Sequence, residues 1–63
     1  MIQIKDLMQS DAGRLVIYDS GHGNEKGVIK SWNDKFIFVV YKWEGDFRKY
    51  TAAATRPEDL SWI

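Results

Sequence analysis

The stretch GVIKSWNDKFIFVVY, residues 27–41, decides the fold. It contains two runs rich in β-branched and aromatic residues, Gly27–Trp32 and Lys35–Tyr41, with only Asn33 and Asp34 between them. Asn and Asp tolerate the positive φ angles that a tight hairpin turn requires. The sequence therefore predicts an antiparallel hairpin at the centre of the chain.

Shorter runs of the same kind flank this hairpin, and turn-forming residues separate them. They predict three further strands over Arg14–Tyr18, Lys49–Ala53 and Ser61–Ile63, the first followed by a loop over Asp19–Lys26. Five short strands, a long first loop and a tight central hairpin are typical of a small SH3-like barrel. We expect a mainly β fold in which residues 1–63 form one such domain.

The ends of the chain predict short helical turns. Thr55–Leu60 predicts one helical or 3₁₀ turn before the last strand, because Thr55 and Glu58 have the spacing of a capping box. Arg56, which precedes a proline, is a second candidate for the N-cap. Residues 2–9 fit either a strand followed by a turn or a short helical turn.

The composition limits the chemistry. The chain has 63 residues, no Cys and one His, which excludes a disulfide and a Cys/His zinc site, and we expect no cofactor. A domain this short must bury its apolar residues efficiently. We expect Val16, Ile29, Val39 and Leu60 in the core, because each is aliphatic and falls in a predicted strand or in the capped turn.

The charge and the hydropathy pattern indicate a cytoplasmic protein without a membrane partner. Nine basic and nine acidic residues balance, so the net charge does not favour binding to a nucleic acid or a membrane surface. No apolar run approaches the roughly 20 residues of a membrane span, and the first residues do not resemble a signal peptide.

The third predicted strand is apolar on both faces. Side chains alternate between faces along a strand, which places Ile37 and Val39 on one face and Phe38 and Val40 on the other. Something must cover the second face. The candidates are the N-terminal segment through Ile2, Ile4, Leu7 and Met8, a strongly bent strand that serves both halves of the barrel, a partner, or a second copy of the chain.

No group of residues predicts catalysis, and we expect a protein that is not an enzyme. Asp19–His22 contains the side-chain types of a serine triad, but adjacent loop residues do not easily adopt the triad geometry. Gly21, Gly23 and Gly27 lack the spacing of a dinucleotide-binding loop, and a strand rather than a helix follows them. We interpret residues 19–26 as a flexible loop.

Aromatic residues outside the predicted core indicate a binding function. A Trp and a Phe in the segment 42–48 are costly unless something covers them, and Trp and Tyr are frequent anchors of protein interfaces. We expect a protein-binding surface on a monomer or weak homodimer. Its candidate residues are Tyr18, Trp32, Trp43, Phe47 and Tyr50.

The alternative is a module that binds single-stranded nucleic acid. Residues 26–56 hold seven basic and three acidic residues, a net charge of +4, and aromatic residues interleave with the basic ones. Basic grooves with stacking aromatic side chains bind single strands. The candidate residues for this alternative are Lys30, Lys35, Lys42, Arg48 and Lys49.

The segments Gly27–Tyr41 and Thr51–Leu60 resemble short, uncharacterised proteins encoded by bacteriophages and prophages. The resemblance covers roughly residues 11–62, and Ala54–Leu60, ATRPEDL, is its most specific part. It implies an SH3-like barrel, a bacterial host cytoplasm and a host or phage protein as partner. It transfers no activity and no binding residues, and the segment 42–49 looks longer and more aromatic than is usual among these proteins.

Overall fold

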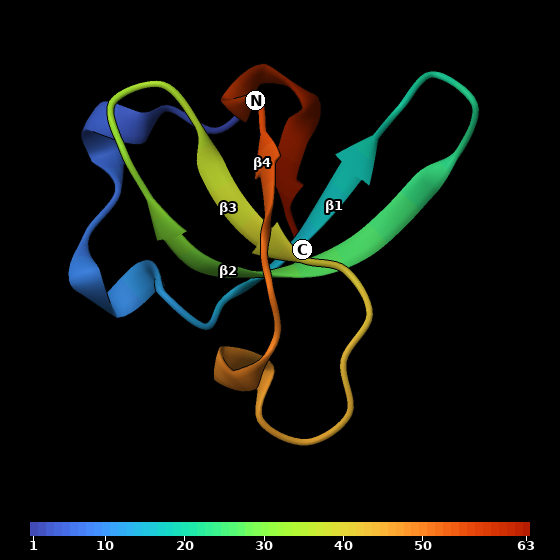
Figure 1. Ribbon diagram of the computed structural model, residues 1–63. Helices are drawn as coiled ribbons and strands as arrows, with labels where there is room; N and C mark the ends of the chain where they lie inside the picture. The colour runs from blue at the N-terminus through green and yellow to red at the C-terminus, as the bar shows by residue number, and fades with distance from the viewer.

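The computed structural model describes all residues, 1–63, as a five-stranded antiparallel sheet with short 3₁₀ turns (Figure 1). The sheet has the order β4-β3-β2-β1-β5 and is open, because no pairing joins β4 to β5. The predicted mainly β class is confirmed. The strands are β1 (Leu15–Asp19), β2 (Asn24–Trp32), β3 (Ile37–Val40), β4 (Ala53–Thr55) and β5 (Leu60–Trp62), and the 3₁₀ turns are η1 (Ile4–Asp6), η2 (Gln9–Asp11), η3 (Phe47–Lys49) and η4 (Pro57–Asp59).

The first loop is shorter than predicted, because β2 begins at Asn24 and not at Gly27. Glu25 pairs with Tyr18 and Lys26 with Ile17, so the polar start of β2 extends the hairpin with β1. The sequence does not predict this part of the strand, because Asn24, Glu25 and Lys26 are polar or charged. Figure 1 shows β2 as a long curved ribbon that runs beneath the other strands.

The predicted central hairpin forms, but β3 spans Ile37–Val40 rather than 35–41, so residues 33–36 connect the strands instead of Asn33 and Asp34 alone. No residue other than glycine has a positive φ, so Asn33 does not use the left-handed region. Its backbone N–H donates to the Phe36 carbonyl oxygen at 3.0 Å. Its side-chain Oδ1 accepts from the N–H groups of Lys35 at 2.8 Å and Phe36 at 2.7 Å. The asparagine closes the turn through its side chain.

The prediction of a strand over Lys49–Ala53 is wrong by several residues. The Asp46 side chain accepts from the Arg48 N–H at 3.0 Å and caps η3, and β4 begins only at Ala53. The predicted capping box is also wrong, because Thr55 lies in β4 and is buried. Arg56 is the N-cap of η4, although its side chain makes no capping hydrogen bond.

The core lies on one face of the sheet and contains all four residues predicted for it. Val16, Ile29, Val39 and Leu60 are fully buried, as is Ile37, and Ile2 completes the core cluster at 3% exposure. Gly27 is buried among them, and a Cβ at this position would collide with Val39 Cγ1. A glycine is therefore required where the side chains of Val39 and Tyr41 lie against β2.

The N-terminal segment covers this core face, with Ile2 in the cluster and Ile4 and Leu7 packed against it. Met8 does not take part and is 67% exposed. Of the candidates for covering the two apolar faces of β3, the N-terminal segment therefore covers the face of Ile37 and Val39 and not that of Phe38 and Val40.

The second face is covered partly by the chain between β3 and β4. Val28 and Val40 pair across β2 and β3 and are buried, at 2% and 1% exposure, but lie outside the core cluster. Turn η3 lies against β2. A bulge at Lys30 interrupts the register, and the Lys30 ammonium donates to the Tyr50 carbonyl oxygen at 2.6 Å. At this bulge, the Lys30 side chain therefore binds the chain between β3 and β4.

Candidate functional site

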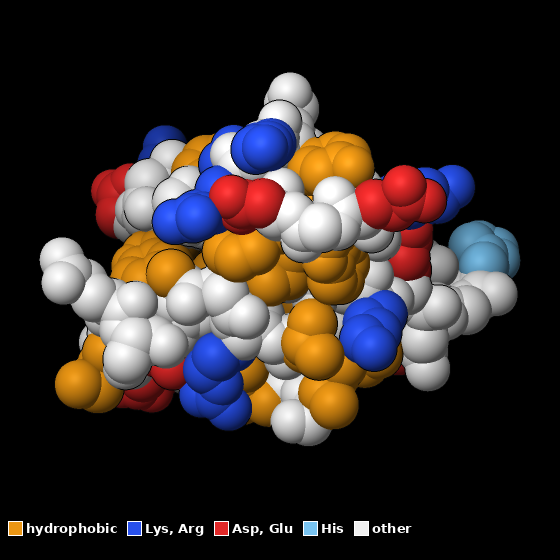
Figure 2. Space-filling view, turned by 90° about the horizontal axis from the view of Figure 1, so that it is seen from below, with side chains coloured by type: hydrophobic (Ala, Val, Ile, Leu, Met, Phe, Trp, Pro, Cys, Tyr) orange, Lys and Arg blue, Asp and Glu red, His pale blue; other side chains and the backbone are white.

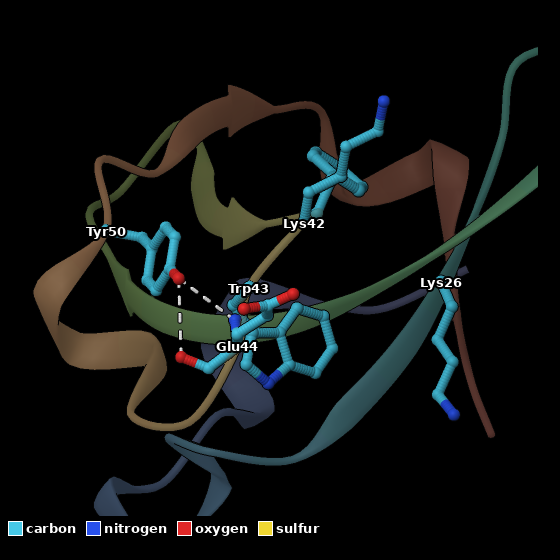
Figure 3. A pocket seen from close by; sticks show the side chains of 6 residues that line it. Lys26, Lys42, Trp43, Glu44 and Tyr50 are labelled. Carbon is cyan, nitrogen blue, oxygen red and sulfur yellow. Dashed lines mark hydrogen bonds between the residues drawn. The ribbon is translucent and has the colours of Figure 1, made fainter.

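A cavity of about 530 Å³ opens where β3 ends and the chain leaves the sheet (Figure 3). The pairing of β2 with β3 stops at Val28 and Val40, whereas β2 extends four residues further, to Asn24. The chain after β3 turns away and returns through η3, which leaves space beside the start of β2. The cavity is lined by Lys26, Tyr41, Lys42, Trp43, Glu44 and Tyr50.

Hydrogen bonds hold the segment 42–50 in place. The Tyr50 hydroxyl accepts from the Glu44 N–H at 3.0 Å and donates to the Glu44 carbonyl oxygen at 3.3 Å, as the dashed lines in Figure 3 show. Gly45 permits the tight reversal with φ +74°. Arg48 forms a bidentate pair with Asp46, with Nε–Oδ1 at 2.9 Å and Nη2–Oδ2 at 2.9 Å. The hydrogen bonds from the Arg48 side chain and N–H lower the pKa of Asp46.

Tyr41 forms a fixed wall of the cavity. Its ring carbon Cδ1 lies 3.0 Å from the position that a Cβ on Gly27 would take, and its ring meets Tyr18 edge to face at a centroid distance of 5.8 Å. Its hydroxyl shares a hydrogen bond of 2.7 Å with Thr55 Oγ1. Burial raises the pKa of Tyr41. The Tyr41 ring is therefore held by contacts with Tyr18 and Thr55.

Trp43 is the least constrained aromatic residue of the cavity. Its side chain is half-buried, and its indole N–H makes no hydrogen bond within the chain. Because no buried polar side-chain atom lacks a partner, that N–H is open to solvent. Trp43 thus offers an apolar ring and a free donor to a ligand.

A second cavity of about 340 Å³ adjoins the first and shares Tyr41 with it. It lies between the β1–β2 hairpin, β4 and η4. Its other lining residues are Tyr18, Glu25, Ala53, Ala54, Thr55, Arg56 and Asp59.

The five aromatic residues predicted as one surface do not all meet. Trp43 and Tyr50 line the first cavity, and Tyr18 lines the second. Trp32 packs against the core, and the Phe47 ring lies beside Gly13, 3.7 Å from where a Cβ would stand. Neither Trp32 nor Phe47 lines any of the five cavities. The expected single patch is therefore divided.

The sequence does not predict Tyr41 and Lys26 as cavity residues, because Tyr41 falls at the end of a predicted strand and Lys26 at the end of a predicted loop. The sequence feature that could have indicated Tyr41 is Gly27, the glycine of the predicted strand Gly27–Trp32. A glycine inside a strand marks a close approach of another group, here the ring of Tyr41.

The basic residues predicted for nucleic-acid binding do not form one groove. Lys30 is engaged with the Tyr50 carbonyl oxygen and Arg48 with Asp46. Lys42 lines the first cavity and Lys35 a separate one near the N-terminus. No cavity is lined by more than one residue of the predicted set, which also includes Lys49.

The arginines and the lysines differ in their pairing. Arg14 pairs with Asp11 at 3.0 Å, Arg48 with Asp46 at 2.9 Å, and Arg56 with Glu58 at 3.4 Å and Asp59 at 3.1 Å. No lysine takes part in an ion pair. The lysines beside the cavity, Lys26 and Lys42, therefore keep their charge available.

Figure 2 shows the face of the molecule on the side of the β3–β4 segment. Hydrophobic side chains gather across its middle, and side chains of both charges surround them. The face is thus an apolar surface with a charged rim.

The segment Asp19–His22 forms a local turn. The Ser20 hydroxyl donates to the Gly23 carbonyl oxygen at 3.2 Å and accepts from the His22 N–H at 3.3 Å, so its contacts are with the backbone. No group of three or more His, Asp or Glu side chains is placed to hold a metal ion. The structure also contains no helix with the length and apolar character needed to span a membrane.

No family model, no curated protein and no solved structure matches the chain.

Proposed function

We propose that the protein is a non-enzymatic interaction module that binds another protein through the aromatic surface formed by Tyr18, Tyr41, Trp43 and Tyr50. The observation that supports this most strongly is the cavity of about 530 Å³ beside the start of β2. Three aromatic side chains line it, none of them is fully buried, and the Trp43 indole N–H is free. Partly exposed Trp and Tyr side chains in a preformed hollow are typical anchors for a protein ligand.

We further propose an SH3-like barrel as the architecture. The strand order β4-β3-β2-β1-β5, the curved β2 that pairs on both sides and the turn η4 between β4 and β5 support this assignment. The resemblance of Gly27–Tyr41 and Ala54–Leu60 to bacteriophage and prophage proteins supports a phage setting. The partner is then a host or phage protein in the bacterial cytoplasm.

The test compares Trp43→Ala with Phe36→Ala. Phe36 is also an aromatic residue of a turn, is 37% exposed and lines no cavity, so it is a matched control. We expect Trp43→Ala to lower the free energy of unfolding by less than about 1 kcal/mol. We also expect it to remove the proteins that the wild-type chain captures from bacterial lysate, while Phe36→Ala retains them.

Two outcomes would contradict the proposal. A loss of about 3 kcal/mol or more in Trp43→Ala would identify the tryptophan as a lid on the core rather than a recognition residue. Capture that disappears after nuclease treatment would instead favour the single-stranded nucleic-acid alternative, in which binding weakens steeply as salt is added.

A further inference from the structure

The first cavity is bordered by a strand edge whose hydrogen-bonding groups are unused. In an antiparallel pair, every second residue directs its N–H and C=O toward the partner strand, and the residues between direct theirs away. Two bonds set this alternation along β2: Ser20 N–H donates to the Gly23 carbonyl oxygen at 3.2 Å, and Ile29 N–H donates to that of Arg14 at 3.0 Å. Glu25 and Gly27 therefore face β1, whereas the backbone groups of Lys26 face the other side.

Strand β3 does not reach Lys26. The ladder between β2 and β3 ends at Val28 and Val40, and no backbone hydrogen bond joins Lys26 to the segment that follows β3. Lys26 nevertheless lines the cavity together with Trp43 and Tyr50. The hollow therefore has one border that can pair with an extended backbone and another that is aromatic.

The charges at the cavity favour an acidic ligand. The ammonium groups of Lys26 and Lys42 take part in no ion pair, and Glu44 is the only carboxylate among the lining residues. Figure 3 shows the two lysine side chains extending in different directions, with the Trp43 ring to one side of both. A lysine on a strand edge discourages a basic or purely apolar strand, but it is compatible with an acidic one.

We propose that an extended acidic segment of another protein adds as a strand to the free edge of β2. Its backbone pairs with the N–H and C=O of Lys26, its apolar side chains contact Trp43, and its carboxylates lie near Lys26 and Lys42. The mode is β-strand addition, in which the main chain provides affinity and alternate side chains provide specificity. This inference rests on the proposed function and names the class of partner for the same site.

A second copy of the chain is the less suitable occupant. The edge strands that a second copy offers are β4, with the sequence AAT, and β5, with the sequence LSW, and neither contains a carboxylate that could meet Lys26 and Lys42. The free edge of its β2, Asn24–Lys26, contains one carboxylate, Glu25, but places the Lys26 of each copy at the same edge. An acidic strand from another protein can pair with the backbone N–H and C=O of Lys26 and can also place carboxylates near the ammonium groups of Lys26 and Lys42.

The test is an NMR titration of the full chain with the blocked hexapeptide Ac-EVEVEV-amide and its basic counterpart Ac-KVKVKV-amide. We expect the acidic peptide to slow hydrogen exchange of the Lys26 amide and to shift the Trp43 indole resonance, and the basic peptide to do neither. In the double variant Lys26→Glu with Lys42→Glu, affinity for the acidic peptide should fall about tenfold and the preference should reverse. Both lysine side chains are exposed, so the fold should tolerate these changes.

Methylation of the peptide nitrogens tests the backbone pairing itself. In one peptide the three Val amides are methylated, and in the other the three Glu amides. Because only alternate amides of an added strand face β2, one methylated peptide should lose binding and the other should retain it. Equal binding of the two peptides would overturn the inference.

Other outcomes also separate the inference from the proposed function. If the acidic peptide leaves the Lys26 amide unprotected while Trp43→Ala still loses its lysate partners, strand addition is wrong and the aromatic binding surface stands. If the Lys26 amide becomes protected without peptide as the protein concentration rises, together with a dimer in sedimentation, a second copy occupies the edge and the inference is also wrong. If Trp43→Ala keeps every partner, the proposed function itself fails.

Discussion

The two halves of β2 have different surroundings. Residues 28 and 29 lie between β1 and β3, and their side chains are buried on opposite faces. Residues 24–26 pair with β1 alone and are exposed, and Lys26 borders the first cavity. One strand therefore supports the core at its centre and presents a free edge at its start. The difference arises because β3 ends at Val40 while β2 continues.

The largest effect should come from truncating the centre of β2. Ile29 is fully buried in the core cluster. Ile29→Ala should lower the free energy of unfolding by about 3 kcal/mol, through lost transfer energy and the cavity left behind. Lys26→Ala, the control in the open half, should change it by less than about 0.5 kcal/mol. Urea titration measures both, and equal effects would show that the two halves do not differ.

The boundary between the halves is Gly27. Adding a Cβ there forces Val39 and Tyr41 to move, so Gly27→Ala should cost about 2 kcal/mol in unfolding free energy. If the collision with Val39 is the cause, the double variant Gly27→Ala with Val39→Ala should be more stable than the sum of the two single effects predicts. Additive effects would place the cost of Gly27→Ala elsewhere.

The wall that separates the two cavities depends on Tyr41. Tyr41→Phe removes the hydrogen bond of 2.7 Å to Thr55 Oγ1 and should lower the free energy of unfolding by about 1 kcal/mol. Burial raises the pKa of this hydroxyl above its ordinary value of 10.0. Its contribution is therefore complete below that pH and is lost as pH rises through the folded-state pKa. The wild-type chain should lose stability above pH 10, and Tyr41→Phe should lose less; parallel pH profiles would contradict this assignment.

The smallest effect on stability should come from Asp46, in the segment 42–50 that borders the first cavity. The bond from Arg48 lowers the pKa of Asp46, so Asp46 contributes to stability above its ordinary pKa of 3.8 and loses that contribution as pH falls through the lower folded-state value. Asp46→Asn should therefore speed hydrogen exchange of the Arg48 and Tyr50 amides at neutral pH with little effect on global stability. Exchange rates equal to those of the wild-type chain would show that the Asp46–Arg48 pair does not hold the loop.

The sequence was sufficient to predict the parts of the fold in which apolar periodicity dominates. The central hairpin and the burial of Val16, Ile29, Val39 and Leu60 follow from β-branched residues at strand spacing. The polar start of β2 and the late start of β4 could not be predicted in this way. The first depends on pairing with β1, and the second on the cap that Asp46 provides for η3.

Prediction of the candidate site was also partial, for a related reason. A large aromatic residue in a predicted turn indicates a surface, which identified Trp43, whereas Tyr50 was included as a neighbour from a predicted strand. Whether Trp32 and Phe47 belong to the same surface depends on the bulge at Lys30 and on the path of the chain through η3. Both are properties of the tertiary structure that local patterns do not contain.

Hydrogen exchange of the Lys26 amide in the free protein tests the contrast between the two halves of β2 most directly. Val28 pairs with Val40 and is buried, whereas Lys26 lines the cavity and its N–H, which faces away from β1, has no partner in the chain that follows β3. We predict that the Val28 amide exchanges at a rate set by global unfolding and that the Lys26 amide exchanges far faster, close to an unprotected amide. Equal protection of the two amides would show that the edge of β2 is already occupied, and would contradict the account.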